Sequence, residues 1–224
     1  MCWLTACARD GSGHDAIRKG KLAGDLARDY PRHCVPDTGV RDLKMDTHPK
    51  WLRPSKIPLT VVCGPPCSGK TTYVRNSAVP GDTVIDLDQI RRKIDPTFKP
   101  WQGNVEEKLL LRAMRVRNMM LAQLSKATEG SAFFIVAAPY KQEREWWSSK
   151  LGGLLVLLNP GIEECKRRAY ARGTPIAAAG VATWEAKSMQ RWHPPTPRRR
   201  IASDGWFSDD VDEADIALYK ALSP

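Results

Sequence analysis

The sequence lacks an apolar run long enough to cross a membrane. Its longest, from Leu151 to Leu158, has only the length of a β-strand. The first ten residues also lack the basic start and the apolar stretch of a secretory signal peptide. The sequence therefore predicts a cytoplasmic protein with no membrane partner.

Cysteine is scarce as well. Six cysteines in 224 residues do not make the disulfide framework of a secreted protein. Cys63 and Cys67 lie beside and within a glycine-rich loop, which favours free thiols in a reducing compartment. No internal repeat is present, and with 42% hydrophobic residues the chain can bury one sizeable core.

Negative charge is in short supply, because 35 Lys and Arg face 25 Asp and Glu and leave a net charge of +10. The basic residues gather at 91–93, 112–117, 166–168 and 198–200. Such an excess fits a polyanionic partner, most simply nucleic acid. Solvated helix faces and nucleotide contacts explain the excess equally well, so composition leaves both interpretations open.

The chain divides into three regions. Residues 1–55 have little periodicity, which predicts an irregular N-terminal segment. Residues 56–195 alternate apolar runs with amphipathic stretches and form the main domain. Residues 196–224 combine a basic linker with a C-terminal helix.

The main domain contains four apolar runs that predict strands, at 59–63, 83–86, 132–136 and 154–158, and the first is expected to be buried on both faces. Helices are predicted over 70–77, 88–94, 106–126, 143–150, 160–172 and 181–192, with a small-residue loop at 173–180. Strands that alternate with helices form parallel βαβ units. The predicted fold is therefore α/β, a three-layer sandwich around a parallel sheet.

A glycine-rich loop follows the first predicted strand and precedes a helix. It reads Gly64-Pro65-Pro66-Cys67-Ser68-Gly69-Lys70-Thr71 and matches the P-loop pattern G-x-x-x-x-G-K-[ST]. Its backbone N–H groups form a nest for phosphates, so these residues and Thr72 are predicted to bind ATP. We expect Lys70 to act catalytically on the β- and γ-phosphates, and the Thr71 hydroxyl to ligate Mg²⁺.

Asp88 and Arg91 follow the second strand, at the edge of the sheet that faces the ligand in open α/β folds. A carboxylate there can accept the proton of an attacking hydroxyl, and an arginine one helical turn later can hold the acceptor's phosphate. Asp88 equally fits the N-cap of the next helix. The residues alone leave base and cap open.

Arg168 and Arg172 lie four residues apart on one face of a charged helix, beside the small-residue loop. Two guanidinium groups on a lid can clamp phosphates and neutralise charge during transfer. A solvated basic helix face is the alternative interpretation.

Together the three motifs resemble the 5′-hydroxyl polynucleotide kinase domain of phage-type DNA kinases, within a wider group of small P-loop kinases that includes zeta toxins. The resemblance spans Leu59 to Trp192. It implies a P-loop NTPase sandwich with a helical lid, Asp88 as general base and Arg91 as ligand of the acceptor. It also implies two lid arginines, Arg168 on ATP and Arg172 in catalysis.

The sequence departs from that family at the end of the third strand. Ala137-Ala138-Pro139 stands where such kinases often carry an acidic, Thr or Asn side chain, which favours a different acceptor. Asp86 is an additional carboxylate that can support Mg²⁺ through water. No D-x-D-x-T stretch is present, so we expect no 3′-phosphatase activity.

Two stretches of the N-terminal segment, 14–19 and 46–51, resemble the tail of phage HNH endonucleases. Paired C-x-x-C knuckles and a complete ββα-metal motif are absent from the sequence, so we expect a remnant or a docking arm, not a nuclease. Trp101, Trp146 and Trp147 flank the predicted ligand edge. Base stacking and core packing are alternative roles for them.

The sequence thus predicts an ATP- and Mg²⁺-dependent phosphotransferase. The resemblance implies that it is encoded by a phage and that its acceptor is a hydroxyl on nucleic acid, DNA rather than RNA. That hydroxyl is a 5′ end or a hydroxymethyl group on a modified base such as 5-hydroxymethyluracil. A small-molecule, nucleotide or zeta-toxin-like kinase is a second hypothesis. The third is an ATP-switched nucleic-acid-binding module, against which Asp88 and the lid arginines argue because a switch needs no base.

Overall fold

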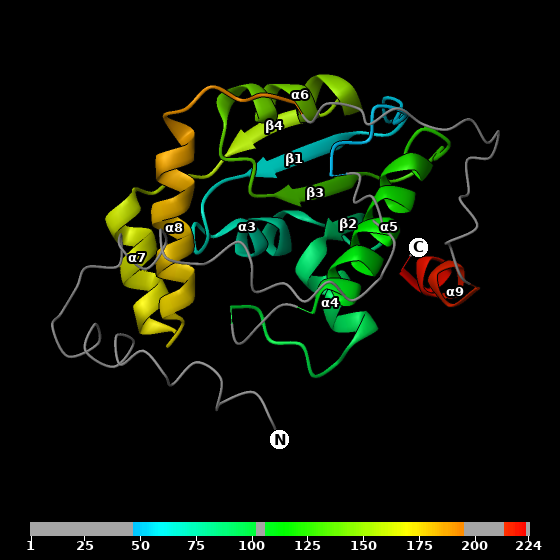
Figure 1. Cartoon of the computed structure of the whole chain (residues 1–224). Helices are drawn as coiled ribbons and strands as arrows, with labels where there is room; N and C mark the ends of the chain where they lie inside the picture. The colour runs from blue at the N-terminus through cyan, green and yellow to red at the C-terminus, as the bar shows by residue number, and fades with distance from the viewer. Residues whose placement is uncertain (1–46, 102–105, 195–212, 223–224) are drawn as a thin grey trace, which may run out of the picture. The chain divides into compact units, whose positions relative to one another are not determined.

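The computed structural model describes residues 47–101, 106–194 and 213–222 (Figure 1). A four-stranded parallel sheet lies at the centre of the main domain, with the strand order β2-β3-β1-β4. The strands are β1 (Leu59–Cys63), β2 (Thr83–Asp86), β3 (Ala132–Val136) and β4 (Leu154–Leu157). Each strand forms where an apolar run predicts it.

Three helices cover the two faces of the sheet: α3 (Lys70–Ser77), α5 (Glu107–Gln123) and α6 (Lys141–Leu151). Successive side chains of a strand point to opposite faces. Val61 and Phe134 therefore join the core formed with α5 and α6, whereas Val62 and Ile135 pack against α3. The predicted α/β fold, a three-layer sandwich around a parallel sheet, is confirmed.

Four further helices complete the described residues: α4 (Leu87–Ile94), α7 (Ile162–Ala171), α8 (Pro175–Ser188) and α9 (Glu213–Leu222). α4 follows β2 directly, and α9 contacts α5. α7 and α8 pack against each other beyond the carboxyl ends of the strands, and we call this pair the lid (Figure 1). Parallel α/β sheets bind their ligands at that end.

The small-residue loop predicted for residues 173–180 is wrong, because α8 begins at Pro175. Proline suits the first turn of a helix, where its missing N–H costs nothing. The alanines at 177–179 are the strongest helix formers. Only Arg172 to Thr174 separate α7 from α8, so the lid is a helical hairpin with a short turn.

Residues 47–58 reach the first strand through turns, without a helix or a strand. Leu52 is only 2% exposed within the core. The N–H groups of Ser55 and Lys56 donate to the carbonyls of Leu151 and Leu124, at 2.8 and 2.9 Å. This part of the N-terminal segment is therefore attached to the main domain.

The predictions for residues 1–46 and for the linker at 196–212, with its three arginines at 198–200, lie outside the described residues. Among the helices that the structure describes, none has the length and apolar character needed to cross a membrane.

Candidate active site

The loop between β1 and α3 can be built only with glycine at its first position. Gly64 has a φ of +150°, and a Cβ there would lie 2.2 Å from the carbonyl oxygen of Leu158 and 2.8 Å from Oγ of Ser68. Gly69 has a φ of +100° and begins α3 without a capping side chain. Because no side chain caps α3, its first N–H groups remain available to an anion.

Lys70 lies over this loop. Its Nζ donates to the carbonyl oxygens of Gly64 and Pro65, at 2.9 and 2.7 Å. Burial lowers the pKa of Lys70 to about 8, against the opposing effect of the negative charge on Asp86. The side chain of Ser68 is buried, and its Oγ has no hydrogen-bond partner among the described residues. Thr71 and Thr72 are exposed on the first turn of α3.

The two carboxylates after β2 have different roles. Asp86 is the N-cap of α4, where Oδ1 accepts a hydrogen bond from the N–H of Asp88 at 3.0 Å. Its carboxyl group is buried, and burial raises its pKa. Asp88 lies inside the first turn of α4 with its side chain 37% exposed. The structure thus gives the capping role to Asp86, and the carboxylate of Asp88 faces outward enough to meet a ligand.

Arg91 is held next to Asp88. Its Nη1 lies 3.5 Å from Oδ1 of Asp88, and its guanidinium carbon lies 4.8 Å from the ring centroid of Phe98. The side chain is mostly buried, and Nε has no partner among the described residues. Arg91, the residue predicted to bind the acceptor, is therefore held in place by Asp88 and Phe98.

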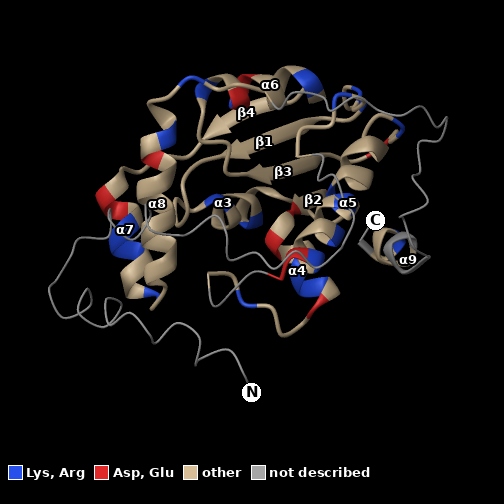
Figure 2. Ribbon diagram, in the orientation of Figure 1, with Lys and Arg blue, Asp and Glu red and all other residues tan. Residues whose placement is uncertain are grey.

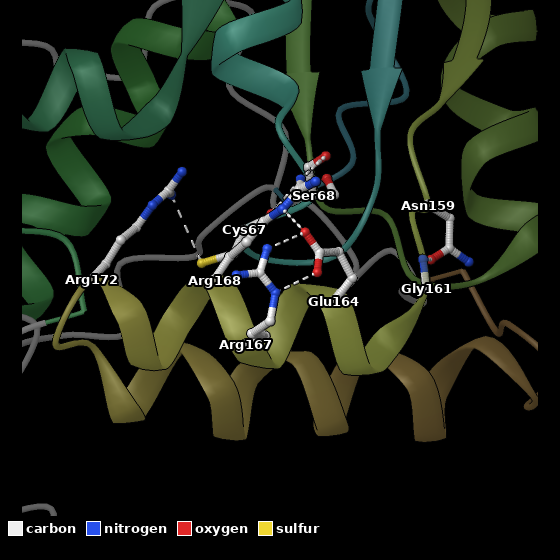
Figure 3. A network of polar contacts seen from close by, with 8 residues as sticks. All are labelled: Cys67, Ser68, Asn159, Gly161, Glu164, Arg167, Arg168 and Arg172. Carbon is white, nitrogen blue, oxygen red and sulfur yellow. Dashed lines mark hydrogen bonds and ion pairs between the residues drawn. The ribbon is translucent and has the colours of Figure 1, made fainter.

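Figure 3 shows the two predicted lid arginines at the end of α7 turned toward the P-loop. Nη1 of Arg168 approaches the carbonyl oxygens of Cys67 and Ser68, both at 3.5 Å. Nη1 of Arg172 lies 4.0 Å from Sγ of Cys67. Cys67 also packs against Ala169, which belongs to the alanine cluster between α7 and α8. The lid therefore lies directly on the loop.

Glu164 is a part of the site that the motifs did not reveal. It accepts hydrogen bonds from Arg167 at 2.7 and 2.8 Å and from Nε of Arg168 at 2.7 Å. These hydrogen bonds, first from Arg167 and then from Arg168, lower the pKa of Glu164 to about 2. The glutamate orients Arg168 and also offsets part of its charge. Its spacing, four residues before Arg168, is the sequence signal for such a pair.

The basic groups of the sequence are less available than the net charge suggests. On α7, Lys166 pairs with Glu163 at 2.8 Å and Arg167 pairs with Glu164, so both signs lie on this helix (Figure 2). On α5, Arg117 is buried and donates to the carbonyl of Thr47 at 3.1 Å. These side chains contribute to the packing and the charge balance of the protein itself.

The backbone carbonyls that follow β3 already accept hydrogen bonds from side chains of the protein. The carbonyls of Ala138 and Pro139 accept from Arg144, at 3.0 and 2.5 Å. The carbonyl of Ala137 accepts from Nε1 of Trp184 on α8 at 2.8 Å. This edge therefore helps to hold the lid.

The residues at the loop fit a nucleotide with Mg²⁺. A phosphate suits the buried, unpartnered hydroxyl of Ser68, the uncapped start of α3 and the amine of Lys70. The described residues contain no cluster of three or more His, Cys, Asp or Glu side chains that could hold a metal. Mg²⁺ in such sites needs only one or two protein ligands besides phosphates and water, and Thr71 and Asp86 are the candidates.

A comparison with protein families places most of the main domain in a known family. A family model described as an AAA domain matches residues 59–195, more than half of the chain. The matched range contains all four strands, the P-loop, the segment from Asp86 to Arg91, and the lid. A comparison with curated proteins found no match.

Proposed function

The chain belongs to the AAA domain family, within the superfamily of P-loop kinases, and from this premise we propose that it transfers the γ-phosphoryl group of ATP to a hydroxyl on nucleic acid. A P-loop domain binds a nucleotide, usually with Mg²⁺. The nature of the acceptor and the role of each residue are our proposal.

The observation that carries the proposal is the contact of the lid with the P-loop. Arg168 and Arg172 approach Cys67 and Ser68 from a helix some hundred residues later in the chain. Phosphoryl transfer depends mainly on positioning and on the stabilisation of charge spread over the phosphoryl oxygens. Guanidinium groups against the phosphate loop can supply that stabilisation.

The loop residues have separate tasks in this proposal. The N–H groups of residues 64–71 and the Ser68 hydroxyl bind the phosphates, and Lys70 exchanges its carbonyl partners for phosphate oxygens. Thr71 directly, and Asp86 through water, would hold Mg²⁺. When bound, Mg²⁺ neutralises charge on the β- and γ-phosphate oxygens.

Asp88 is the proposed general base. The acceptor oxygen forms a bond to the γ-phosphorus, the bond from that phosphorus to the bridging oxygen of ADP breaks, and the acceptor proton passes to the carboxylate of Asp88. Three features support this role: the partial exposure of Asp88, its place at the carboxyl end of β2 and the capping of α4 by Asp86. Arg91 beside it is the proposed ligand for a phosphate of the acceptor.

A nucleic-acid acceptor is supported by the net charge of +10 and by exposed Arg92, Lys93 and Arg172 near the motif residues. The 5′-hydroxyl end of a nucleic-acid strand is one candidate acceptor, as in the polynucleotide kinases that the motifs resemble. A hydroxymethyl base is the other candidate, and the unusual end of β3 favours it.

A small-molecule kinase is the second candidate. It is favoured by the ion pairs on α7 and the burial of Arg117, because basic residues with partners inside the protein contribute less to binding a polyanion. A non-catalytic switch does not need the carboxylate of Asp88 or the lid arginines.

The test is the transfer of label from γ-labelled ATP to a panel of acceptors. The panel contains a 5′-hydroxyl oligonucleotide, its 5′-phosphorylated form, DNA with 5-hydroxymethyluracil, nucleosides and sugar nucleotides. Label on the 5′-hydroxyl oligonucleotide or on the DNA with 5-hydroxymethyluracil supports the proposal. Loss of label on the 5′-phosphorylated form identifies the 5′ end as the acceptor. Label on small acceptors alone establishes the second candidate in its place.

A further inference from the structure

Trp101 is an exposed aromatic side chain that follows Asp88 and Arg91 in the chain. It follows Phe98, the partner of Arg91, by three positions, in the connection between α4 and α5. Its side chain is 42% exposed, although tryptophans usually bury most of their surface. Its φ is +64°, a left-handed backbone conformation that bulky residues rarely adopt.

The indole of Trp101 and the ring of Pro66 both border Gly180 of α8, so the indole lies beside the lid and the P-loop. A Cβ built on Gly180 of α8 would lie 3.0 Å from Cζ3 of Trp101 and 3.3 Å from Cγ of Pro66. A side chain at 180 would therefore press on the indole and on the loop. This contact explains why glycine, a weak helix former, occurs inside α8.

Two locally unfavourable features thus accompany this position of the indole. The backbone of Trp101 is left-handed, and α8 gives up a helix-forming residue at 180. Core packing does not explain the placement, because a large part of the indole remains exposed. Trp147, by contrast, is 1% exposed and belongs to the core. An exposed aromatic face supported from behind is suited to bind a flat ligand ring.

We propose that Trp101 is the platform on which a nucleobase of the acceptor strand stacks, while Pro66 and Gly180 hold the indole in place. Its place beside Gly180 and Pro66 puts the indole next to the P-loop. This inference rests on the proposed nucleic-acid acceptor and adds to it a recognition of base rings that does not depend on base identity.

The test compares two labelled single strands of equal length, one of thymidines and one of abasic residues. Equilibrium binding by fluorescence anisotropy is measured for the parent protein and for Trp101→Ala. Stacking of a base contributes roughly 5- to 100-fold in affinity. We expect Trp101→Ala to weaken thymidine binding within that range and to leave abasic binding unchanged. Trp101→Phe should restore most of the loss.

Two further variants test the position of the indole and provide a control. Gly180→Ala should weaken thymidine binding, since its Cβ would displace the indole. Leu154→Ala removes an exposed apolar side chain at the amino end of β4, and should change neither strand's binding. A rise in the KM for ATP in Trp101→Ala, with both strands bound as before, overturns the inference in favour of a lid contact.

The remaining outcomes are also decisive. Equal weakening of both strands by Trp101→Ala overturns the stacking inference and leaves the proposed acceptor in place. If the parent protein binds neither strand, the nucleic-acid acceptor itself is wrong, and the stacking inference fails with it.

Discussion

At the scale of single residues, the site depends on two carboxylates that are two positions apart. Asp86 is buried and binds the backbone of α4, so its main contribution is to the start of the helix. Asp88 does not cap the helix, and its Oδ1 lies 3.5 Å from Nη1 of Arg91. The second carboxylate is therefore the better candidate for proton transfer.

Asp88→Asn tests this division. Asparagine keeps the size of the side chain but not its basicity, so we expect kcat to fall about 10²–10⁴-fold, the usual contribution of general acid–base catalysis. The KM for ATP and the melting temperature should stay near the parent values, because Asp86 remains the cap. Steady-state kinetics and thermal unfolding check both statements. Parent-like kcat in the folded variant would remove Asp88 from the mechanism.

Cysteine reactivity provides a test of nucleotide binding that needs no acceptor. The free thiols of the described residues are Cys63, Cys67 and Cys165. Burial raises the pKa of Cys63 to about 12 and also raises that of Cys165, so both thiols stay protonated and shielded at pH 8. Cys67 is only partly buried in the P-loop.

We therefore expect iodoacetamide at pH 8 to alkylate Cys67 and to spare Cys63 and Cys165, as read by peptide mass mapping. Mg·ATP should slow the alkylation of Cys67, because the phosphates and the lid cover the loop. An alkylation rate of Cys67 that does not respond to nucleotide speaks against binding at this loop.

At the scale of elements, the strands and the P-loop could be predicted because their signals are local. A buried parallel strand is a continuous apolar run, such as that ending at Cys63, and the loop follows it in a fixed pattern. The start of α8 could not be predicted in the same way. The small residues from 175 to 180 suggest a loop, and the reason for Gly180 is an indole about eighty residues earlier in the chain.

The partners of charged side chains were equally hard to predict. The capping of α4 by Asp86 depends on where that helix begins, to within one residue. The burial of Arg117 depends on the packing of residue 47 against α5. Such pairs arise from tertiary structure, and a basic cluster in the sequence does not reveal them.

We expect different effects from replacing two basic residues of the lid. Arg172 points to the P-loop, whereas Lys166 on α7 pairs with the exposed Glu163. Arg172→Ala should lower kcat more than it raises the KM for ATP, since its charge acts on the phosphoryl group in transfer. Lys166→Ala is the control and should be close to the parent, because exposed ion pairs contribute little. Equal losses in both variants would indicate a general weakening of α7.

At the scale of the whole molecule, the net charge of +10 predicts that the affinity for nucleic acid falls as the salt concentration rises. Each phosphate of a single strand that is neutralised contributes about −0.7 to the slope of log affinity against log salt. With about four contacts, the affinity for an oligonucleotide should fall roughly 50-fold between 50 and 200 mM salt. Fluorescence anisotropy across this range measures the slope. A flat response favours the small-molecule kinase, whose acceptor releases few counterions.

The most direct test of the proposed phosphotransfer compares the parent protein with Lys70→Ala in the transfer of label from γ-labelled ATP. With the parent, we expect label on a nucleic-acid acceptor. With the variant, we expect background levels, and its circular dichroism and melting should be preserved because Lys70 contacts the loop and not the core. Transfer by Lys70→Ala near the parent rate, or no transfer by the folded parent to any acceptor, would show that the protein is not the proposed kinase.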